Sequence, residues 1–333
     1  MPRRADRLVV LVLVLVLVLG ACGRAGGKAD ASANASADAK ADADASTSTS
    51  TSTSTSTSTS DDEDYLNGVP RVARSIGHTS VVFKVELSTG KKAVFKPASR
   101  RGPVRYKGEI AARRLGVALG LEKNVPRVFF RAMDAKAMAA AASGGPAPTG
   151  ELFAKEAIVT GDVVKGALLP WIVELAFLPL EREPLASQWK DWLKKGGAVP
   201  EDQQELARQI STLVAFDFVT GNWDRWSGGN VGLDKATGTL LFIDNDGAFF
   251  DAPPTEALQK NKRLVEGIDR FSRSFVTRLR ELDDVLLAQA LGEESPGVPL
   301  LSAKALAGVL HRRKQLLQIL DAKTADAALL SFP

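Results

Sequence analysis

The stretch Ala215-Phe-Asp-Phe-Val-Thr-Gly-Asn-Trp-Asp-Arg225 places a polar, glycine-containing turn directly after an apolar run. Apolar residues recur at helical spacing over 201–218, which predicts a helix that leads into this turn. A second polar turn, Asp244-Asn-Asp-Gly247, follows a short apolar strand predicted over 239–243. Polar loops between buried elements are common positions for functional residues. The two turns together therefore form the candidate functional site.

The acidic residues of these turns suit phosphoryl transfer. That reaction needs a carboxylate to orient the acceptor hydroxyl and oxygen ligands to hold Mg²⁺. Asp224 is the candidate catalytic residue, and Asp244 and Asn230 are the candidate metal ligands; Asp246 is either a further ligand or a solvated side chain. Because the chain has one cysteine, Cys22, and two histidines, any metal should be oxygen-ligated, most simply Mg²⁺ or Mn²⁺.

The chain before the candidate site predicts a sheet with one helix. Runs rich in β-branched and aromatic residues over 79–87 and 92–96 are separated by Ser88-Thr-Gly90, which predicts a hairpin. A helix is predicted over 106–119, with Gly120 at its C-terminal end. Lys96, at the end of the second strand, is placed to reach the α- and β-phosphates of a nucleotide, and Glu109, on the helix, to pair with it.

A loop before the first strand is the candidate phosphate loop. The stretch Ser75-Ile-Gly-His-Thr-Ser80 contains one glycine, Gly77, and two hydroxyl side chains, Thr79 and Ser80. Backbone amides and these hydroxyls are suitable donors to phosphate, although the loop lacks the several glycines of a typical phosphate cradle. With Lys96 and Glu109, these residues predict an ATP site.

The remaining elements divide the folded region into two parts. Further strands are predicted over 125–133 and 152–159, divided by a loop over 135–150, and further helices over 275–291 and 302–320, the last with Ser302 as N-cap. The result is an α+β chain with a β-rich lobe over 66–165 and a mainly helical lobe over 166–333.

The order of the candidate residues carries a resemblance. A strand lysine, a helix glutamate, Asp-x5-Asn, a strand and a final aspartate follow one another as in a two-lobed kinase. The motifs Phe95-Lys-Pro97, Gly108-Glu-Ile-Ala-Ala112, Gly221-Asn-Trp-Asp-Arg225 and Phe242-Ile-Asp-Asn-Asp-Gly247 resemble the secretory-pathway kinases of the Golgi casein kinase and four-jointed family, and more distantly the phosphoinositide kinases. The resemblance implies a bilobal protein-kinase-like fold. Trp226 departs from it, because relatives often have histidine there.

The N-terminus predicts export and lipid attachment. A basic segment is followed by twelve apolar residues from Leu8 to Leu19, and then by Gly-Ala-Cys22. As a helix this run spans about 18 Å, against the ~30 Å hydrocarbon core of a bilayer, which favours a cleaved signal over a membrane span. Residues 1–21 are therefore interpreted as a lipoprotein signal peptide and Cys22 as the lipidated residue. An uncleaved anchor and a plain secretory signal are the alternatives.

The segment 22–65 is predicted to be a disordered linker. Residues 23–60 contain no Leu, Ile, Val or aromatic side chain, and Ser and Thr alternate over 46–60. A segment with so little apolar surface cannot offset the entropy cost of ordering. The sequence thus predicts a domain tethered to a membrane of the bacterial cell envelope through lipidated Cys22.

Two kinds of function fit these features. The first is an ATP- and Mg²⁺- or Mn²⁺-dependent kinase that acts on a hydroxyl of a protein serine or threonine, a sugar or a lipid. The alternative is a pseudokinase, a nucleotide-binding or scaffold lipoprotein without catalysis; a purely structural envelope protein is a third. The net charge is +4, of which +2 belongs to the first 21 residues. A charge this small gives no reason to expect nucleic acid as a partner.

Overall fold

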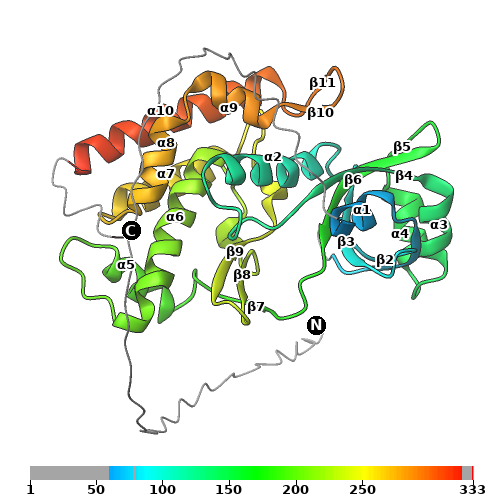
Figure 1. The fold of residues 1–333 in the computed structure, drawn as a ribbon, viewed down its shortest axis with the longest axis horizontal. Helices are drawn as coiled ribbons and strands as arrows, with labels where there is room; N and C mark the ends of the chain where they lie inside the picture. Colours follow the sequence, from blue (N-terminus) through cyan, green and yellow to red (C-terminus); the bar gives the residue numbers. More distant parts are fainter. Residues whose placement is uncertain (1–59, 78–79, 325–331, 333) are drawn as a thin grey trace, which may run out of the picture. The chain divides into compact units, whose positions relative to one another are not determined.

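The computed structural model describes residues 60–77, 80–324 and Phe332 (Figure 1). The signal peptide predicted over 1–21, the lipidation site Cys22, the linker up to residue 59 and Thr79 lie outside the described residues. None of the described helices combines the length and the apolarity needed to cross a membrane.

An antiparallel sheet forms the first lobe. Its strands run in the order β1-β2-β3-β6-β4, and β5 pairs with β6. The strands are β1 Pro70–Ser75, β2 Phe83–Leu87, β3 Lys92–Pro97, β4 Phe129–Asp134, β5 Val159–Thr160 and β6 Val163–Pro170. The hairpin predicted around Ser88-Thr-Gly90 is confirmed as β2–β3, and Gly90 has the positive φ of 81° that favours glycine at such a turn.

Four helices accompany this sheet, and two of them correct the sequence prediction. They are α1 Ser60–Asn67, α2 Arg105–Ala118, α3 Ala135–Ser143 and α4 Thr149–Glu156. The loop predicted over 135–150 and the strand predicted over 152–159 are wrong, because α3 and α4 occupy most of these residues. Alanine is the strongest helix former, and the Asp134 side chain caps α3 by accepting from the Ala137 amide over 2.6 Å.

The second lobe is mainly helical, as predicted. Its helices are α5 Leu185–Trp192, α6 Gln204–Thr220, α7 Thr255–Gly267, α8 Arg273–Glu281, α9 Asp284–Leu291 and α10 Ala303–Thr324. The single helix predicted over 275–291 is wrong: the chain breaks into α8 and α9, and the Asp283 side chain caps the second by accepting from Leu286 N over 2.8 Å. Ser302 caps α10, as predicted, by accepting from Ala305 N over 3.0 Å.

Short strands and 3₁₀ turns complete the helical lobe. A three-stranded sheet in the order β7-β8-β9 is built from β7 Leu175–Phe177, β8 Val231–Asp234 and β9 Thr239–Phe242. A separate hairpin joins β10 Glu293–Ser295 to β11 Val298–Pro299. The turns are η1 Glu201–Gln203, η2 Arg225–Ser227 and η3 Asn245–Gly247. Both polar turns singled out in the sequence therefore contain 3₁₀ segments beside β8 and β9.

Helix α2 lies between the sheet and the helical lobe (Figure 1). Its apolar residues Ile110, Ala111 and Leu115 are buried in the same core cluster as residues of α6, α8 and α10. The helix ends at the predicted place, where Gly120 has a φ of 72°. Because α2 follows β3 in sequence and packs with the second lobe, it connects the two lobes at the candidate site.

The described part of the chain begins with a helix attached to the sheet lobe. In α1, Asp61 lies 2.6 Å from Lys91 Nζ and 2.6 Å from Arg127 Nη2. Tyr65 is buried and stacks on Phe129 with 5.5 Å between ring centroids. The linker predicted over 22–65 is thus wrong at its C-terminal end, because residues from Ser60 onward form a helix that packs on the sheet.

Candidate active site

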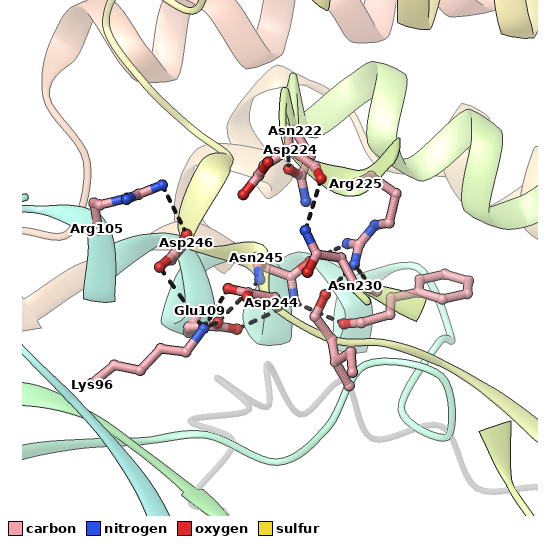
Figure 2. Close-up of polar contacts among 12 residues, drawn as sticks. Lys96, Arg105, Glu109, Asn222, Asp224, Arg225, Asn230, Asp244, Asn245 and Asp246 are labelled. Atoms are coloured by element: carbon pink, nitrogen blue, oxygen red, sulfur yellow. Dashed lines mark hydrogen bonds and ion pairs between the residues drawn. The ribbon is translucent and has the colours of Figure 1, made fainter. Parts of the chain in front are cut away.

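Lys96 joins residues from three elements (Figure 2). Its Nζ lies 2.5 Å from Glu109 Oε1 on α2 and 2.6 Å from Asp244 Oδ1 after β9. Asp246 Oδ2 lies 4.0 Å away. Only 10% of the Lys96 side chain is exposed, and 1% of that of Glu109. The predicted pairing of Lys96 with Glu109 is confirmed, and the structure adds Asp244 to the same lysine.

Strand alternation explains the direction of Lys96. Phe95 belongs to the core cluster of the sheet lobe, so the next residue along β3 points from the opposite face. Helix α2 approaches the turn after β9 closely at Gly108, where a Cβ atom would lie 2.4 Å from the carbonyl oxygen of Asn245. The absence of a side chain at Gly108 therefore allows Glu109 to reach the turn.

The carboxylates decide the charge state of Lys96. Burial alone would lower the pKa of Lys96, but Asp244, Glu109 and Asp246 together raise it well above its ordinary range. Burial would likewise raise the pKa of Asp244, and the Lys96 ammonium holds it below its usual value. The site therefore keeps Lys96 protonated and Asp244 ionised at neutral pH.

Asn245 links the turn after β9 to α2. Its backbone N–H donates to Glu109 Oε1 over 3.0 Å and its Nδ2 to Glu109 Oε2 over 3.3 Å, so both carboxylate oxygens are engaged. Nδ2 also donates to the Phe242 carbonyl over 2.8 Å. Asp244 itself has a φ of 56°, a left-handed conformation that is uncommon for a residue with a side chain. Asn245 was not predicted as a site residue, because the sequence indicated only that it belongs to a turn.

Arg225 connects the two polar turns and is almost fully buried. Its Nε donates to both carboxylate oxygens of Asp217, over 3.0 and 3.1 Å. Its Nη1 donates to the Asn230 carbonyl over 2.5 Å and to the Ile243 carbonyl, and its Nη2 to Asn245 Oδ1 over 2.6 Å. The sequence showed Arg225 beside Asp224, but gave no sign that its guanidinium lies inside the lobe.

Asp224 lies at the start of η2 and is half-buried. Its backbone N–H donates to Asn222 Oδ1 over 3.1 Å, and its carbonyl accepts from Asn230 Nδ2 over 2.7 Å (Figure 2). Asn230 Nδ2 also donates to Ser227 Oγ over 3.3 Å. The amide of Asn230 thus holds the backbone of the loop that carries Asp224, while its role as a metal ligand stays a prediction.

A small recess, with a volume of ≈ 10 Å³ that suits about one water molecule, opens beside Lys96. It is lined by Ser80, Val81, Lys96, Pro97, Ser99, Arg101, Gly102, Arg105, Tyr106 and Asp246. Of the predicted phosphate loop, Ser80 faces this recess, Gly77 is not among its lining residues, and Thr79 lies outside the described residues. Arg101 and Arg105 were not predicted as site residues from the sequence.

Asp246 is buried and ion-paired, so of the two alternatives left by the sequence the solvated side chain is wrong, and the role of a further metal ligand stays a prediction. Its Oδ1 lies 3.2 Å from Arg105 Nη2, and the residue is 4% exposed. Burial raises its pKa to about 6, although the Lys96 ammonium opposes this. Trp226, in the turn that follows Asp224, is also buried and stacks on Trp189 with 5.7 Å between ring centroids. Trp226 therefore fixes the loop after Asp224 against the helical lobe.

The protein resembles known proteins in structure and not in sequence. No protein-family model and no curated protein matches this sequence. The crystal structure of the Golgi casein kinase matches with a TM-score of 0.58 at 14% identity, over 80% of this chain and 77% of that one. The chain has the fold of this kinase.

Two further structures agree with the kinase fold. The Golgi casein kinase with Mn/ADP bound matches with a TM-score of 0.58 at 14% identity, over 81% of this chain and 76% of that one. The structure of hydra Fam20 with sugar matches with a TM-score of 0.56 at 18% identity, over 80% of this chain and 89% of that one. The bilobal α+β kinase-like fold expected from the resemblance to secretory-pathway kinases is confirmed.

The acidic residues around Lys96 fit a divalent cation. Three carboxylates, Glu109, Asp244 and Asp246, surround the cations Lys96 and Arg105, which leaves an excess of one negative charge. In the described chain, no group of three or more His, Cys, Asp or Glu side chains is arranged to hold a metal ion by itself. Mg²⁺ is commonly bound by one or two carboxylates together with phosphate oxygens, and this donor set matches that mode.

Proposed function

We propose that the protein is a kinase that transfers a phosphoryl group from ATP to a hydroxyl, with Mg²⁺ or Mn²⁺. One observation carries this proposal: Lys96 Nζ lies within 2.6 Å of both Glu109 on α2 and Asp244 after β9. The residues come from three separate elements, and the loop carrying Asp224 is bonded to the same turn through Arg225. Kinase chemistry depends mainly on such positioning.

Each side chain has a role in this proposal. Lys96 binds the α- and β-phosphates, and Glu109 keeps Lys96 extended. Asp224 orients the acceptor hydroxyl and takes its proton as the oxygen–phosphorus bond forms and the bond to the leaving ADP oxygen breaks. Asp244 holds the divalent cation, with Asn230 and Asp246 as further candidate ligands. When bound, the cation neutralises charge on the β- and γ-phosphate oxygens.

The side chains that line the recess beside Lys96 support the binding of phosphate there. Ser80 contributes a hydroxyl, and Arg101 and Arg105 contribute guanidinium groups, which bind phosphate well through their fork of N–H donors. Gly77 and Thr79 remain candidate members of the phosphate loop. The proposed acceptor is a hydroxyl of a protein serine or threonine, of a sugar or of a lipid.

Transfer of labelled phosphate tests the proposal. The full chain is incubated with γ-labelled ATP, Mn²⁺ or Mg²⁺, and separate pools of proteins, sugars and lipids, alongside Asp224→Ala and Asp244→Ala. We expect transfer by the wild type, at least 10²-fold less by either variant, and no loss in Asp191→Ala, a change at an exposed aspartate of α5. Equal background labelling in all four proteins would exclude a kinase. Thermal stabilisation by ATP without any transfer would favour the pseudokinase instead.

We also propose that the domain is held at a membrane of the bacterial cell envelope through lipidated Cys22. The basic N-terminal residues, the apolar run over 8–19 and the sequence Leu-Gly-Ala-Cys22 support this proposal. Cys22→Ser is expected to release the protein from the membrane fraction and to abolish incorporation of a labelled fatty acid. Membrane association unchanged by this substitution would point to an uncleaved anchor.

A further inference from the structure

The β10–β11 hairpin of the helical lobe contacts the first turn of α2. Glu294, in β10, accepts a hydrogen bond from the Tyr106 hydroxyl at Oε1 over 2.9 Å, and its Oε2 lies 2.6 Å from Lys107 Nζ. Lys165 Nζ, from β6, lies 3.4 Å from Oε1. Only 2% of the Glu294 side chain is exposed. One buried carboxylate therefore connects the hairpin, α2 and the central sheet.

A second set of contacts holds α2 two turns further along. Arg114 Nη1 donates to the carbonyls of Leu291 and Glu293, over 2.6 and 2.8 Å. These carbonyls flank Gly292, at the junction between α9 and the hairpin. Figure 1 shows the hairpin directly after α9, over the start of α2. The helix is thus attached to one segment of the helical lobe at both Tyr106 and Arg114.

The protonation states agree with this arrangement. Burial alone would raise the pKa of Glu294, but the hydrogen bonds from Lys107 and Tyr106 hold it below its usual value. Burial and the Glu294 carboxylate raise the pKa of the Tyr106 hydroxyl. At neutral pH, Glu294 is therefore ionised and Tyr106 protonated, which is the combination that the hydrogen bond requires.

We propose that Glu294 is a positioning residue that, through α2, holds Glu109 against Lys96. Glu109 follows Tyr106 by three residues, or about one helical turn, so the side chains are mechanically close without touching. Loss of the Glu294 contacts would loosen the start of α2, and a displacement of about 1 Å would lengthen the 2.5 Å contact between Glu109 and Lys96 to the limit of a hydrogen bond. The catalytic consequence rests on the proposed kinase function; the control of α2 does not.

The full chain tests this proposal with Glu294→Gln, Glu294→Ala and a matched control. Glu294→Gln keeps the size of the side chain and an acceptor for Tyr106 but loses the charge that faces Lys107 and Lys165. Glu293→Gln changes the neighbouring carboxylate, which is exposed and accepts from Gly297 N within the hairpin. Three measurements are made: hydrogen exchange of amides 105–118, the acetylation rate of Lys96 by mass spectrometry, and KM for ATP together with kcat.

We expect faster exchange of amides 105–118 and faster acetylation of Lys96 in Glu294→Ala, because a displaced Glu109 no longer covers the Lys96 amine. Smaller effects are expected in Glu294→Gln, and none in Glu293→Gln. We expect kcat/KM to fall by up to about a hundredfold, as misplacement by 1 Å does in other enzymes. A substitution that only weakens folding would instead accelerate exchange throughout the chain.

The outcomes separate the two proposals. Unchanged exchange of 105–118 and unchanged Lys96 acetylation in Glu294→Ala would overturn the positioning role, whatever the activity. Altered exchange and acetylation with wild-type kcat/KM would support the positioning of Glu109 by Glu294 and would overturn only its catalytic consequence. If the wild type transfers no phosphate, the kinase proposal fails, and exchange with acetylation still decides whether Glu294 holds Glu109 against Lys96.

Discussion

Arg225 Nη2 donates to Oδ1 of Asn245 over 2.6 Å, so the residue after Asp224 is bonded directly to the residue after Asp244. Asn245 in turn donates to both oxygens of Glu109. The loop proposed to orient the acceptor, the turn proposed to hold the cation and the helix that carries Glu109 are therefore joined by one buried network. Such a network fixes the relative positions of the groups before any substrate binds.

Asn245→Ala tests the strength of this network. The substitution removes the acceptor of Arg225 and a donor to Glu109, and leaves both charged groups buried. We expect the free energy of unfolding to fall by about 2–4 kcal/mol and KM for ATP to rise. Denaturant unfolding and steady-state kinetics measure the two effects. Asn67→Ala, at an exposed position in α1, should change the free energy of unfolding by less than about 0.5 kcal/mol; an equally small change in Asn245→Ala would contradict the expectation.

Asp217 predicts a dependence of stability on pH. Burial raises its pKa to about 6, from 3.8 for an ordinary aspartate, although the Arg225 guanidinium opposes this. The folded chain thus binds this proton more tightly than the unfolded chain, so the stabilising contribution is present below pH 4 and is lost as pH rises through 6. Between pH 4.5 and 7.5 the loss should be about 2 kcal/mol.

Asp217→Asn provides the comparison for this dependence. The amide does not titrate, so unfolding curves of the variant should lack this component of the pH dependence. The free energy of unfolding of the wild type minus that of the variant should therefore fall as pH rises from 4.5 to 7.5. A difference that is constant, or that grows with pH, would show that the pKa of Asp217 is not raised in the folded chain.

Gly108→Ala tests the close approach of α2 to the turn after β9. On helix propensity alone, alanine would stabilise α2 by roughly 0.5–1 kcal/mol. The added Cβ would lie 2.4 Å from the Asn245 carbonyl oxygen and 3.3 Å from that of Ala248, so we expect a net loss of stability and of phosphoryl transfer instead. Gly267→Ala, at the end of α7 with nothing within 4 Å of the added carbon, is the control and should be neutral or stabilising. Stabilisation by Gly108→Ala would show that α2 and the turn after β9 can move apart at little cost in free energy.

Lys96→Met should change metal binding in the opposite direction to activity. Without its ammonium, Asp244 and Glu109 lose the cation that lies within 2.6 Å of each. We expect Mn²⁺ to bind on the order of tenfold more tightly in the absence of nucleotide, which corresponds to about 1.4 kcal/mol, while phosphoryl transfer is lost. Calorimetric titration with Mn²⁺ measures the affinity, and Lys92→Met, at an exposed position on the same strand, is the control. Weaker binding of Mn²⁺ in Lys96→Met would contradict the placement of the cation beside Asp244.

The sequence predicted the residues whose spacing is constrained by chemistry. Lys96, Glu109 and Asp244 each follow or lie on an element with clear periodicity, and their order along the chain matched a known layout. Arg225 and Asn245 were not predicted to connect the turns, because the periodicity of apolar residues carries no information on whether a polar side chain within a turn points inward. The contact of Glu294 with α2 could not be predicted from the sequence either, since it joins residues 188 positions apart.

The errors in the fold have a similar physical origin. The segment over 135–150 combines alanines with glycines and prolines, and the latter two were taken to indicate a loop. The structure instead has α3 and α4 on either side of a short turn. In α3, the high helix propensity of alanine outweighs the tendency of the nearby glycines and prolines to form a loop. Strand β6, the neighbour of β3, was not predicted, because its run over 163–170 is interrupted by Lys165 and Gly166 and so lacks simple alternation.

Attachment of α1 gives the predicted tether an adjustable length. The ion pairs that join Asp61 to Lys91 and Arg127 are partly exposed, and such pairs weaken as salt shortens the Debye length from about 8 Å at physiological ionic strength to 3 Å at 1 M. Tyr65 is held by burial against Phe129, which salt does not weaken. High ionic strength should therefore release only the first turn of α1. The four released residues would lengthen the predicted linker by roughly 14 Å when extended, while the rest of α1 stays on the sheet lobe. Under the proposed lipid attachment at Cys22, the domain would then lie further from the membrane while the candidate active site stays folded.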